Sequence, residues 1–259
     1  MDAFRVSRNI FLVLLLFLPA LVFGITVPCQ STVSEDKFAS KKIFSARDEN
    51  FTVFAPSQEI ADEVLKKANE FRVEVALKWL GKKLDNGEGQ TIIQVKLSNS
   101  NIGNTWIKNP PRNKHVVEIL ATRERLNAIL AHEIAHTIFL TKFELKLPAW
   151  TDEGIACLQE DEESFRTRCR IAKNSVQMIN RSRIENLFNA GDVPGEIQGN
   201  DSIAMSLVQF FLTLGGEKNL IKFSLDGKKD GWDKALSDHY KIRNIDELQH
   251  QWQNWVIKK

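Results

Sequence analysis

The chain lacks the charge imbalance that marks many nucleic-acid-binding proteins. Its 35 lysines and arginines are matched by 33 acidic residues, which leaves a formal net charge of +2 over 259 residues. No block of basic residues stands out that could serve as an electrostatic footprint for nucleic acid. We therefore expect no nucleic-acid partner.

Cysteine is also scarce, since the chain has only Cys29, Cys157 and Cys169. Three cysteines are too few for a disulfide framework, and an odd number cannot all pair within one chain. On one continuous helix Cys157 and Cys169 would stand about 18 Å apart, beyond bonding reach, so a bridge would need a turn between them. The stretch EDEES at 160–164 could supply that turn, and the sequence leaves the bridge open.

Long apolar runs are limited to one, near the start of the chain. Arg5 and Arg8 precede an apolar stretch over 10–23, which a small residue closes, and this is the layout of a secretory signal peptide. We predict a signal peptide at 1–24, a polar tether at 25–41, and export to the periplasm, the cell surface or the medium. The run is short for a membrane-spanning helix, which needs about 20 apolar residues. Membrane contact is expected only if the leader stays uncleaved.

The rest of the chain has the composition of a globular protein, with 43% hydrophobic and 26% charged residues overall. Its length suits one domain or a two-part domain that shares a cleft. Three segments are predicted to be strands. FTVFA from residue 51 and TIIQVKL from residue 91 alternate as strands do, and HVVEIL from residue 115 is the third candidate.

A helix is predicted between Ser57 and Gly81, because apolar residues recur there at steps of three or four. Residues 98–114 are rich in asparagine and contain two prolines, so they are predicted to form a surface loop. The segment 42–121 is therefore predicted to be a small α/β layer.

From Thr122 onward the pattern is helical. Thr122 is predicted to cap a helix that runs to about Leu140, and Thr151 is predicted to cap the next one. Later helices are predicted over 202–214, 217–225, 231–239 and 245–257. The predicted fold class is α+β: a small N-terminal α/β layer with a short mixed sheet, then a mainly helical half at 122–259, with the active-site cleft between them.

The stretch LAHEIAHTIF, residues 130–139, places Glu133 between His132 and His136. Positions i and i+4 lie on the same face of a helix, so both imidazoles can point at one metal ion. Zinc takes such nitrogens at about 2.0 to 2.1 Å, and a catalytic site adds one more protein ligand and keeps a position for water. Glu133 can reach that water without being a ligand, and we predict it to be the general base of peptide hydrolysis.

The third ligand is expected downstream, on the next helix. After the connector TKFELKLPAW, Glu153 falls in the predicted first turn, where it could face the histidines, and Asp152 is the alternative ligand. Acidic residues also suit a helix N-terminus for capping and dipole reasons alone. The joint pattern of two histidines, a connector and an acidic residue nevertheless favours a metal site. Gly154 and Ala156 add little bulk, which would allow close packing beside a metal.

Other notable residues are predicted to be structural. Cys157 follows Glu153 by one turn and could lie near the metal, but a lone helical cysteine is more often buried filler. His115 is predicted to be a surface or packing residue, and Tyr240, the only tyrosine, to be structural. The tryptophans with helical spacing are predicted to lie in the core: Trp232, Trp252 and Trp255.

These motifs resemble the gluzincin metallopeptidases, in which H-E-x-x-H is completed by a glutamate in an E-G-x-A setting on the next helix. More closely, the chain from about Phe51 to Trp255 resembles the exported peptidase-MA-like proteins of bacteria. The supporting stretches are NFTVFAP, EFRVEVALKWLGKKL, LAHEIAHTIF, LPAWTDEGIACLQE, AMSLVQFFLTLGGEKNL and ELQHQWQNWV. The resemblance implies a zincin-like helical half with one zinc ion per chain. It implies His132, His136 and Glu153 as zinc ligands and Glu133 as catalytic base.

Two elements of the gluzincin aminopeptidases are missing. The chain has no G-x-M-x-N element for the substrate amine, and DSIAMSLVQFF at 201–211 contains no tyrosine to stabilise the oxyanion. We therefore predict an endopeptidase rather than an aminopeptidase, acting on a peptide or protein that pairs with a sheet edge near 116–119. A missing oxyanion donor costs about two to three orders of magnitude in rate. The alternative is a catalytically weak or inactive exported zinc-binding module for surface assembly or partner binding.

Overall fold

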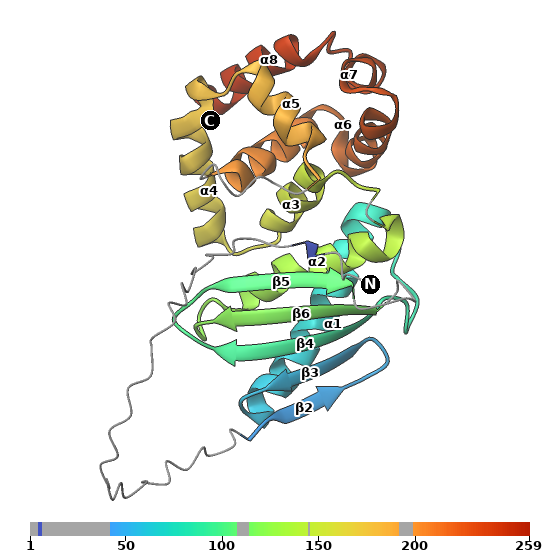
Figure 1. The fold of residues 1–259 in the computed structure, drawn as a ribbon, viewed down its shortest axis with the longest axis vertical. Helices are drawn as coiled ribbons and strands as arrows, with labels where there is room; N and C mark the ends of the chain where they lie inside the picture. Colours follow the sequence, from blue (N-terminus) through green and yellow to red (C-terminus); the bar gives the residue numbers. More distant parts are fainter. Residues whose placement is uncertain (1–4, 7–41, 108–113, 145, 192–198) are drawn as a thin grey trace, which may run out of the picture.

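The computed structural model describes residues 5–6, 42–107, 114–144, 146–191 and 199–259 (Figure 1). The predicted signal peptide at 1–24 and tether at 25–41 lie outside these ranges, apart from β1 (Arg5–Val6). Within the described ranges, none of the helices has both the length and the apolar character needed to cross a membrane.

The strands form one mixed sheet in the order β1-β5-β6-β4-β3-β2. The bounds of the longer strands are Phe44–Arg47 for β2, Phe51–Ala55 for β3, Gln90–Leu97 for β4, Ile102–Ile107 for β5 and Lys114–Ala121 for β6. β3, β4 and β6 run parallel, whereas β2 and β5 are antiparallel to their neighbours. The three predicted strands are therefore confirmed as the centre of the sheet.

The prediction of a loop at 98–114 is wrong for residues Ile102–Ile107, which form β5. Its sequence, IGNTWI, has no regular alternation, but the segment pairs along its whole length with β6, from Ile102 opposite Leu120 to Ile107 opposite His115. Residues 108–113 of the predicted loop lie outside the described ranges. Because β6 is bonded to β4 on one side and β5 on the other, the substrate edge predicted at 116–119 is also wrong.

Helix α1 (Gln58–Leu80) confirms the helix predicted between Ser57 and Gly81. The Ser57 side chain accepts a hydrogen bond from the Ile60 backbone N–H, and Gly81 ends the helix in the left-handed conformation with φ of 72°. The helix packs across β2 and β3 and against α2, and it covers one face of the sheet (Figure 1).

Helix α2 (Leu126–Phe143) begins later than predicted, and Thr122 does not cap it. The Thr122 carbonyl instead accepts a hydrogen bond from Arg125, which makes a turn ahead of the helix. Residues on all sides of α2 are buried, because it lies between β5 and β6 on one side and α1 and α3 on the other. This position explains why the helix is apolar around most of its circumference.

Helix α3 (Ala149–Cys157) begins two residues before Thr151, so the predicted cap is wrong here too. Pro148 precedes the helix with extended backbone, and its carbonyl accepts hydrogen bonds from Thr151 and Asp152. The Thr151 hydroxyl instead donates to Ser224 of α6 at 2.9 Å. The helix start is therefore set by proline, whose φ suits this position.

The helical half continues with α4 (Glu162–Ser175), α5 (Arg181–Asn189), α6 (Asn200–Asp230), α7 (Trp232–Tyr240) and α8 (Ile245–Lys258). The sequence predicted neither α4 nor α5. The two helices predicted around 202–225 are parts of α6, which departs from helical geometry at Gly216. The helix predicted over 245–257 is confirmed as α8, and the Asn244 side chain caps it by accepting a hydrogen bond from the Glu247 N–H.

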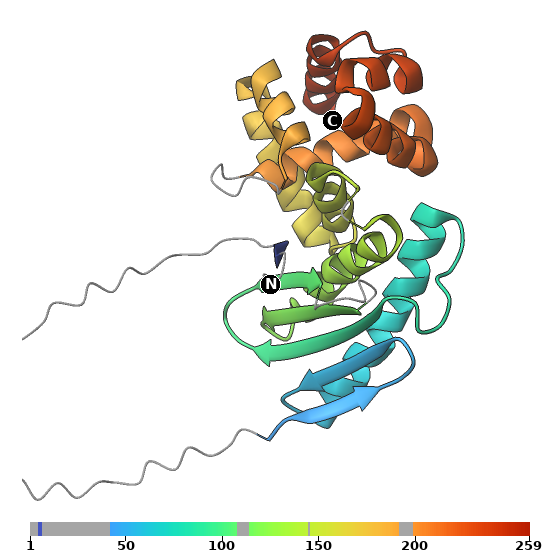
Figure 2. The same cartoon turned by 45° about the vertical axis from the view of Figure 1, so that its right-hand side comes forward.

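Figures 1 and 2 show the sheet layer and the helical layer stacked, with α2 and α3 at their junction. The predicted α+β class is therefore confirmed. The tryptophan prediction is also confirmed, since Trp232 and Trp252 are buried in the core and Trp255 packs against it. Tyr240 is structural, with its ring packed on Phe211 and Phe223.

Candidate metal centre

The three predicted metal ligands meet at one point. His132 and His136 lie one turn apart on α2, and Glu153 comes from the facing helix α3. The two Nε2 atoms are 3.1 Å apart, and each is 3.7 Å from a carboxylate oxygen of Glu153. All three side chains are buried. They form a group that could hold a metal ion.

These separations suit a tetrahedral ion. Two ligand atoms at about 2.0 to 2.1 Å from a zinc ion, at tetrahedral angles, stand about 3.3 Å apart. The observed separations are 3.1 Å between the nitrogens, 3.7 Å from His132 to Glu153 Oε1 and 3.7 Å from His136 to Glu153 Oε2, and they bracket that value. Side-chain shifts of about a few tenths of an ångström would bring both nitrogens and the Glu153 carboxylate into coordination distance.

The second nitrogen of each imidazole is held by a carboxylate. His132 Nδ1 lies 2.8 Å from Glu160 Oε1, and His136 Nδ1 lies 2.9 Å from Asp152 Oδ2. Such an acceptor keeps a proton on Nδ1 and directs Nε2 toward a cation. Asp152, the alternative third ligand, therefore supports His136 from behind, while Glu153 faces both Nε2 atoms.

Negative charge is in excess around the two imidazoles. Burial opposes a charge on His136, but Asp152 and then Glu133 and Glu153 outweigh it and raise the pKa of His136 to about 10. The imidazole therefore binds a proton strongly at neutral pH. A divalent cation would neutralise the negative charge of these carboxylates as the proton does, and its binding would displace the proton.

Glu160 is held in turn by Arg168 of α4. Arg168 NH2 lies 2.6 Å from Glu160 Oε1 and Nε lies 3.3 Å from Oε2, while NH1 contacts Asp201 in the first turn of α6. Burial raises the pKa of Glu160, but His132 and Arg168 outweigh it and lower the pKa to about 2. Glu160 therefore stays ionised as the acceptor for His132.

Glu133, the predicted base, is buried on α2 beneath β5. A Cβ atom at Gly103 would lie 2.2 Å from Glu133 Oε1, far closer than ordinary contact. The strand can therefore approach the carboxylate only because residue 103 has no side chain. Gly154 has a similar role on α3, since a Cβ there would lie 2.7 Å from the Ala204 carbonyl oxygen of α6.

A cavity of about 390 Å³ opens beside the centre. It is lined by Asn101, Ile102, Gly103, Arg125, Ile129, His132, Glu133, Glu160, Arg168 and Asp201. These residues come from the β5 side, from α2 and from the helical half, so the cavity lies between the two layers, as the sequence predicted. Among the described residues that line it there is no tyrosine.

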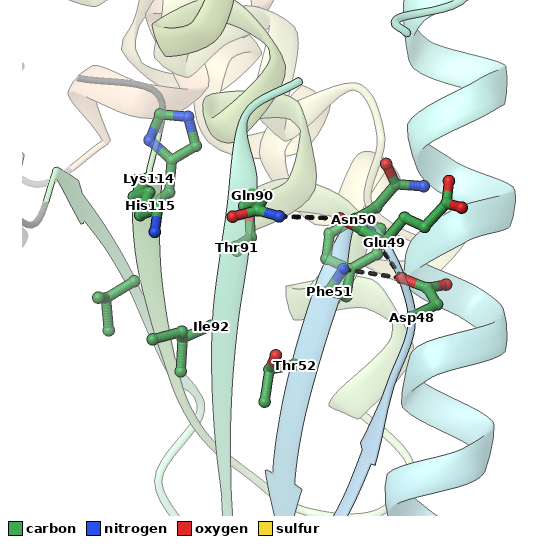
Figure 3. Close-up of a pocket in the computed structure, with 11 residues that line it drawn as sticks. Asp48, Glu49, Asn50, Phe51, Thr52, Gln90, Thr91, Ile92, Lys114 and His115 are labelled. Atoms are coloured by element: carbon green, nitrogen blue, oxygen red, sulfur yellow. Dashed lines mark hydrogen bonds between the residues drawn. The ribbon is translucent and has the colours of Figure 1, made fainter. Parts of the chain in front are cut away.

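A second cavity, of about 230 Å³, lies where β3, β4 and β6 begin (Figure 3). It includes His115, whose Nε2 is 2.9 Å from Thr141 Oγ1 on α2. His115 is a buried packing residue, and burial, with a smaller effect of Arg72, lowers its pKa to about 4. Within the described ranges, the groups that could hold a metal do not include His115.

Cys157 lies close to the centre, but its protonated thiol is a poor metal ligand. Its Sγ is buried, 3.6 Å from Glu153 Oε1, and it joins two other possible donor groups, one with His132 and one with Asp201. Burial and Glu153 raise the pKa of the thiol, which disfavours the thiolate that metals bind. Cys157 and Cys169 are both free thiols, so they form no bridge; Cys29 lies outside the described ranges.

No protein-family model, curated protein or solved structure matches this chain. The interpretation of the centre therefore depends on its own geometry. Sequence reasoning missed four residues that shape it: Gly103, Glu160, Arg168 and Asp201. A metal-binding histidine usually donates its second ring N–H to an acceptor, and this rule predicts a residue such as Glu160. The sequence spacing does not identify which acidic residue fills that role.

Proposed function

We propose that the protein is an exported, zinc-dependent endopeptidase of the gluzincin type, which hydrolyses peptide bonds in a peptide or protein substrate. The observation that carries the proposal is the convergence of the two histidine Nε2 atoms and the Glu153 carboxylate, with Glu133 and a cavity beside them. The proposed export depends on the apolar run over 10–23.

The donor set supports zinc among the divalent metals. Two imidazoles and one glutamate form a known catalytic zinc set, which leaves one position for water or substrate. A zinc ion bound by His132, His136 and Glu153 would lower the pKa of a coordinated water and polarise the substrate carbonyl. Other divalent ions that accept nitrogen and oxygen donors can compete for the site, so elemental analysis must identify the bound metal.

Glu133 supplies the proton transfer. Its carboxylate accepts a proton from the attacking water and then passes that proton to the leaving amine. The close approach of Gly103 limits where the carboxylate can lie. The Glu133 carboxylate therefore needs little reorganisation during the reaction. A catalytic group that is already held in position lowers the activation barrier more than one that must first be ordered.

The substrate path follows β5 rather than β6. Of the described strands, only β1 lies beyond β5, and it pairs there with Thr105 and Trp106. The part of β5 nearest Glu133 has no strand partner on its outer side within the described ranges. An extended peptide could add to that edge and place its scissile bond at the centre.

The test is the variant Glu133→Gln, with Glu124→Gln as control. Glu124 is exposed just ahead of α2, so its substitution should leave the centre intact. We expect Glu133→Gln to abolish hydrolysis of a peptide library while it keeps about one zinc per chain. Turnover in Glu133→Gln at the rate of the control would refute the role of Glu133.

A second candidate function is an exported zinc-binding module without catalysis. The observation that favours it is the position of Tyr240, which packs in an aromatic cluster with Phe211 and Phe223. No tyrosine lies in the described cavity wall to donate a hydrogen bond to the oxyanion that forms during peptide hydrolysis. The loss of such a donor costs about two to three orders of magnitude in rate. This candidate predicts bound metal in the unaltered protein and no cleavage of any peptide in the library.

A further inference from the structure

Arg168 lies where it can influence a metal ligand that it does not touch. Its side chain is partly buried between α4 and α6, with 14% of it exposed. Its contacts are the two oxygens of Glu160 and one oxygen of Asp201. Glu160 in turn accepts the hydrogen bond of His132 Nδ1.

We propose that Arg168 is a positioning residue for His132, acting through Glu160. The guanidinium holds the Glu160 carboxylate in one orientation, and that carboxylate sets the tilt and tautomer of the imidazole. His132 Nε2 is thereby turned toward His136 and Glu153. The inference rests on the proposed metal centre, but it does not depend on whether the protein cleaves peptides.

The geometry requires arginine rather than any cation. Nε and NH2 engage separate oxygens of Glu160, while NH1 reaches Asp201 on another helix. A planar guanidinium can make these contacts at once, whereas an ammonium is a single point charge and cannot form the fork. Lysine at this position would keep the charge but lose the orientation of Glu160.

The two histidines therefore depend on different parts of the molecule. His136 is supported by Asp152, which lies on α3 beside the ligand Glu153. His132 is supported through Arg168 and Asp201, which lie on α4 and α6. These two helices thus contribute to metal affinity without supplying a ligand.

The first experiment compares Arg168→Lys with Arg166→Lys. Arg166 lies on the same helix in an exposed pair with Glu162, so it is a matched control. Zinc affinity is measured on metal-stripped protein by competition with a chromophoric chelator. We expect Arg168→Lys to weaken zinc binding about 10-fold to 100-fold, the effect of losing an outer partner, and Arg166→Lys to leave it unchanged. Thermal unfolding of the metal-stripped variants checks that both are folded.

Two further measurements separate positioning from other roles. The chain has five histidines, so the ¹⁵N imidazole spectrum of labelled zinc-loaded protein is simple enough to follow the His132 tautomer. We expect its Nδ1–H signal to change in Arg168→Lys. Asp201→Asn, which keeps the Arg168 contact with Glu160, should weaken zinc binding less than Arg168→Lys does.

Equal zinc affinity and equal kcat in Arg168→Lys and the unaltered protein would make Arg168 merely structural and would remove this inference alone. Equal zinc affinity with a lower kcat would assign Arg168 to the substrate, since it also lines the cavity. Absence of zinc binding by the unaltered protein would remove the proposed function together with this inference.

Discussion

Substituting Gly103 by alanine should slow catalysis without removing the metal. The added Cβ would lie 2.2 Å from Oε1, 2.7 Å from Cδ and 2.8 Å from Cγ of Glu133. Carbon atoms prefer separations of about 3.5 to 4.0 Å. Because β5 is hydrogen-bonded along its length to β6, the carboxylate is the easier group to move. It must shift by about 1 Å to relieve the contact.

A displacement of about 1 Å in a catalytic group can cost about 100-fold in rate, or about 2.7 kcal/mol in the activation barrier. We expect that loss in kcat/KM for Gly103→Ala, measured with a mixture of quenched fluorescent peptides. Zinc content should stay at the wild-type level, because the three atoms nearest the added methyl group all belong to Glu133 and none to a metal ligand.

Gly191→Ala is the matched control, since no atom lies within 4 Å of a Cβ built there. It should behave as the unaltered protein in both measurements. A Gly103→Ala variant with the rate of Gly191→Ala would refute the placement of Glu133 against β5. Loss of zinc from Gly103→Ala would show that the strand supports the ligands rather than the base.

The pKa of His136, raised to about 10, means that zinc must displace a proton, so zinc affinity should rise about tenfold per pH unit between about pH 6 and 8. Chelator competition at each pH measures this, and a flat profile would contradict it. His115 has a folded pKa of about 4, below its ordinary value, so the unfolded chain binds the proton more tightly and stability is complete above about pH 6.5. Urea titrations should show a loss of about 3 kcal/mol as pH falls to about 4, and His115→Gln should remove that slope; an unchanged slope would exclude His115 as its cause. Gly154→Ala should destabilise by about 1 to 3 kcal/mol through overpacking against Ala204 and Val208, with thermal unfolding as the readout and an unchanged melting temperature as the contrary result.

Local signals in the sequence predicted the elements that depend on local interactions. Ser57 and Gly81 delimit α1 because a side-chain cap and a left-handed residue act within one turn. The same signals failed at Thr122 and Thr151, whose hydroxyl groups were expected to cap helices and do not. A threonine can cap only where the chain enters the helix, and Pro148 supplied that entry for α3 instead.

Non-local pairing explains the main error in the sheet. β5 is extended because β6 offers it a complete set of backbone partners, from Ile102 opposite Leu120 onward. The composition of IGNTWI is ambiguous, since isoleucine, threonine and tryptophan favour strands whereas the glycine and asparagine in the middle do not. Gly103 is needed there because of Glu133, a residue from a different element.

In the candidate site too, the sequence predicted the residues that local spacing places and missed those that tertiary packing places. The spacing of His132, Glu133 and His136 follows from the period of one helix, so the sequence alone predicted their shared face. Glu160 and Arg168 lie behind that face on segments whose approach depends on how the helices pack. Helix spacing places residues within one element, and tertiary packing decides which carboxylate lies behind which imidazole.

The most direct test of the metal centre is the zinc content of the purified chain by elemental mass spectrometry. Three proteins are compared: the unaltered chain, His132→Ala and His250→Ala, where His250 is an exposed histidine of α8. Our account predicts about one zinc per chain in the unaltered protein and in His250→Ala, and none in His132→Ala. Equal metal content in all three proteins would contradict it.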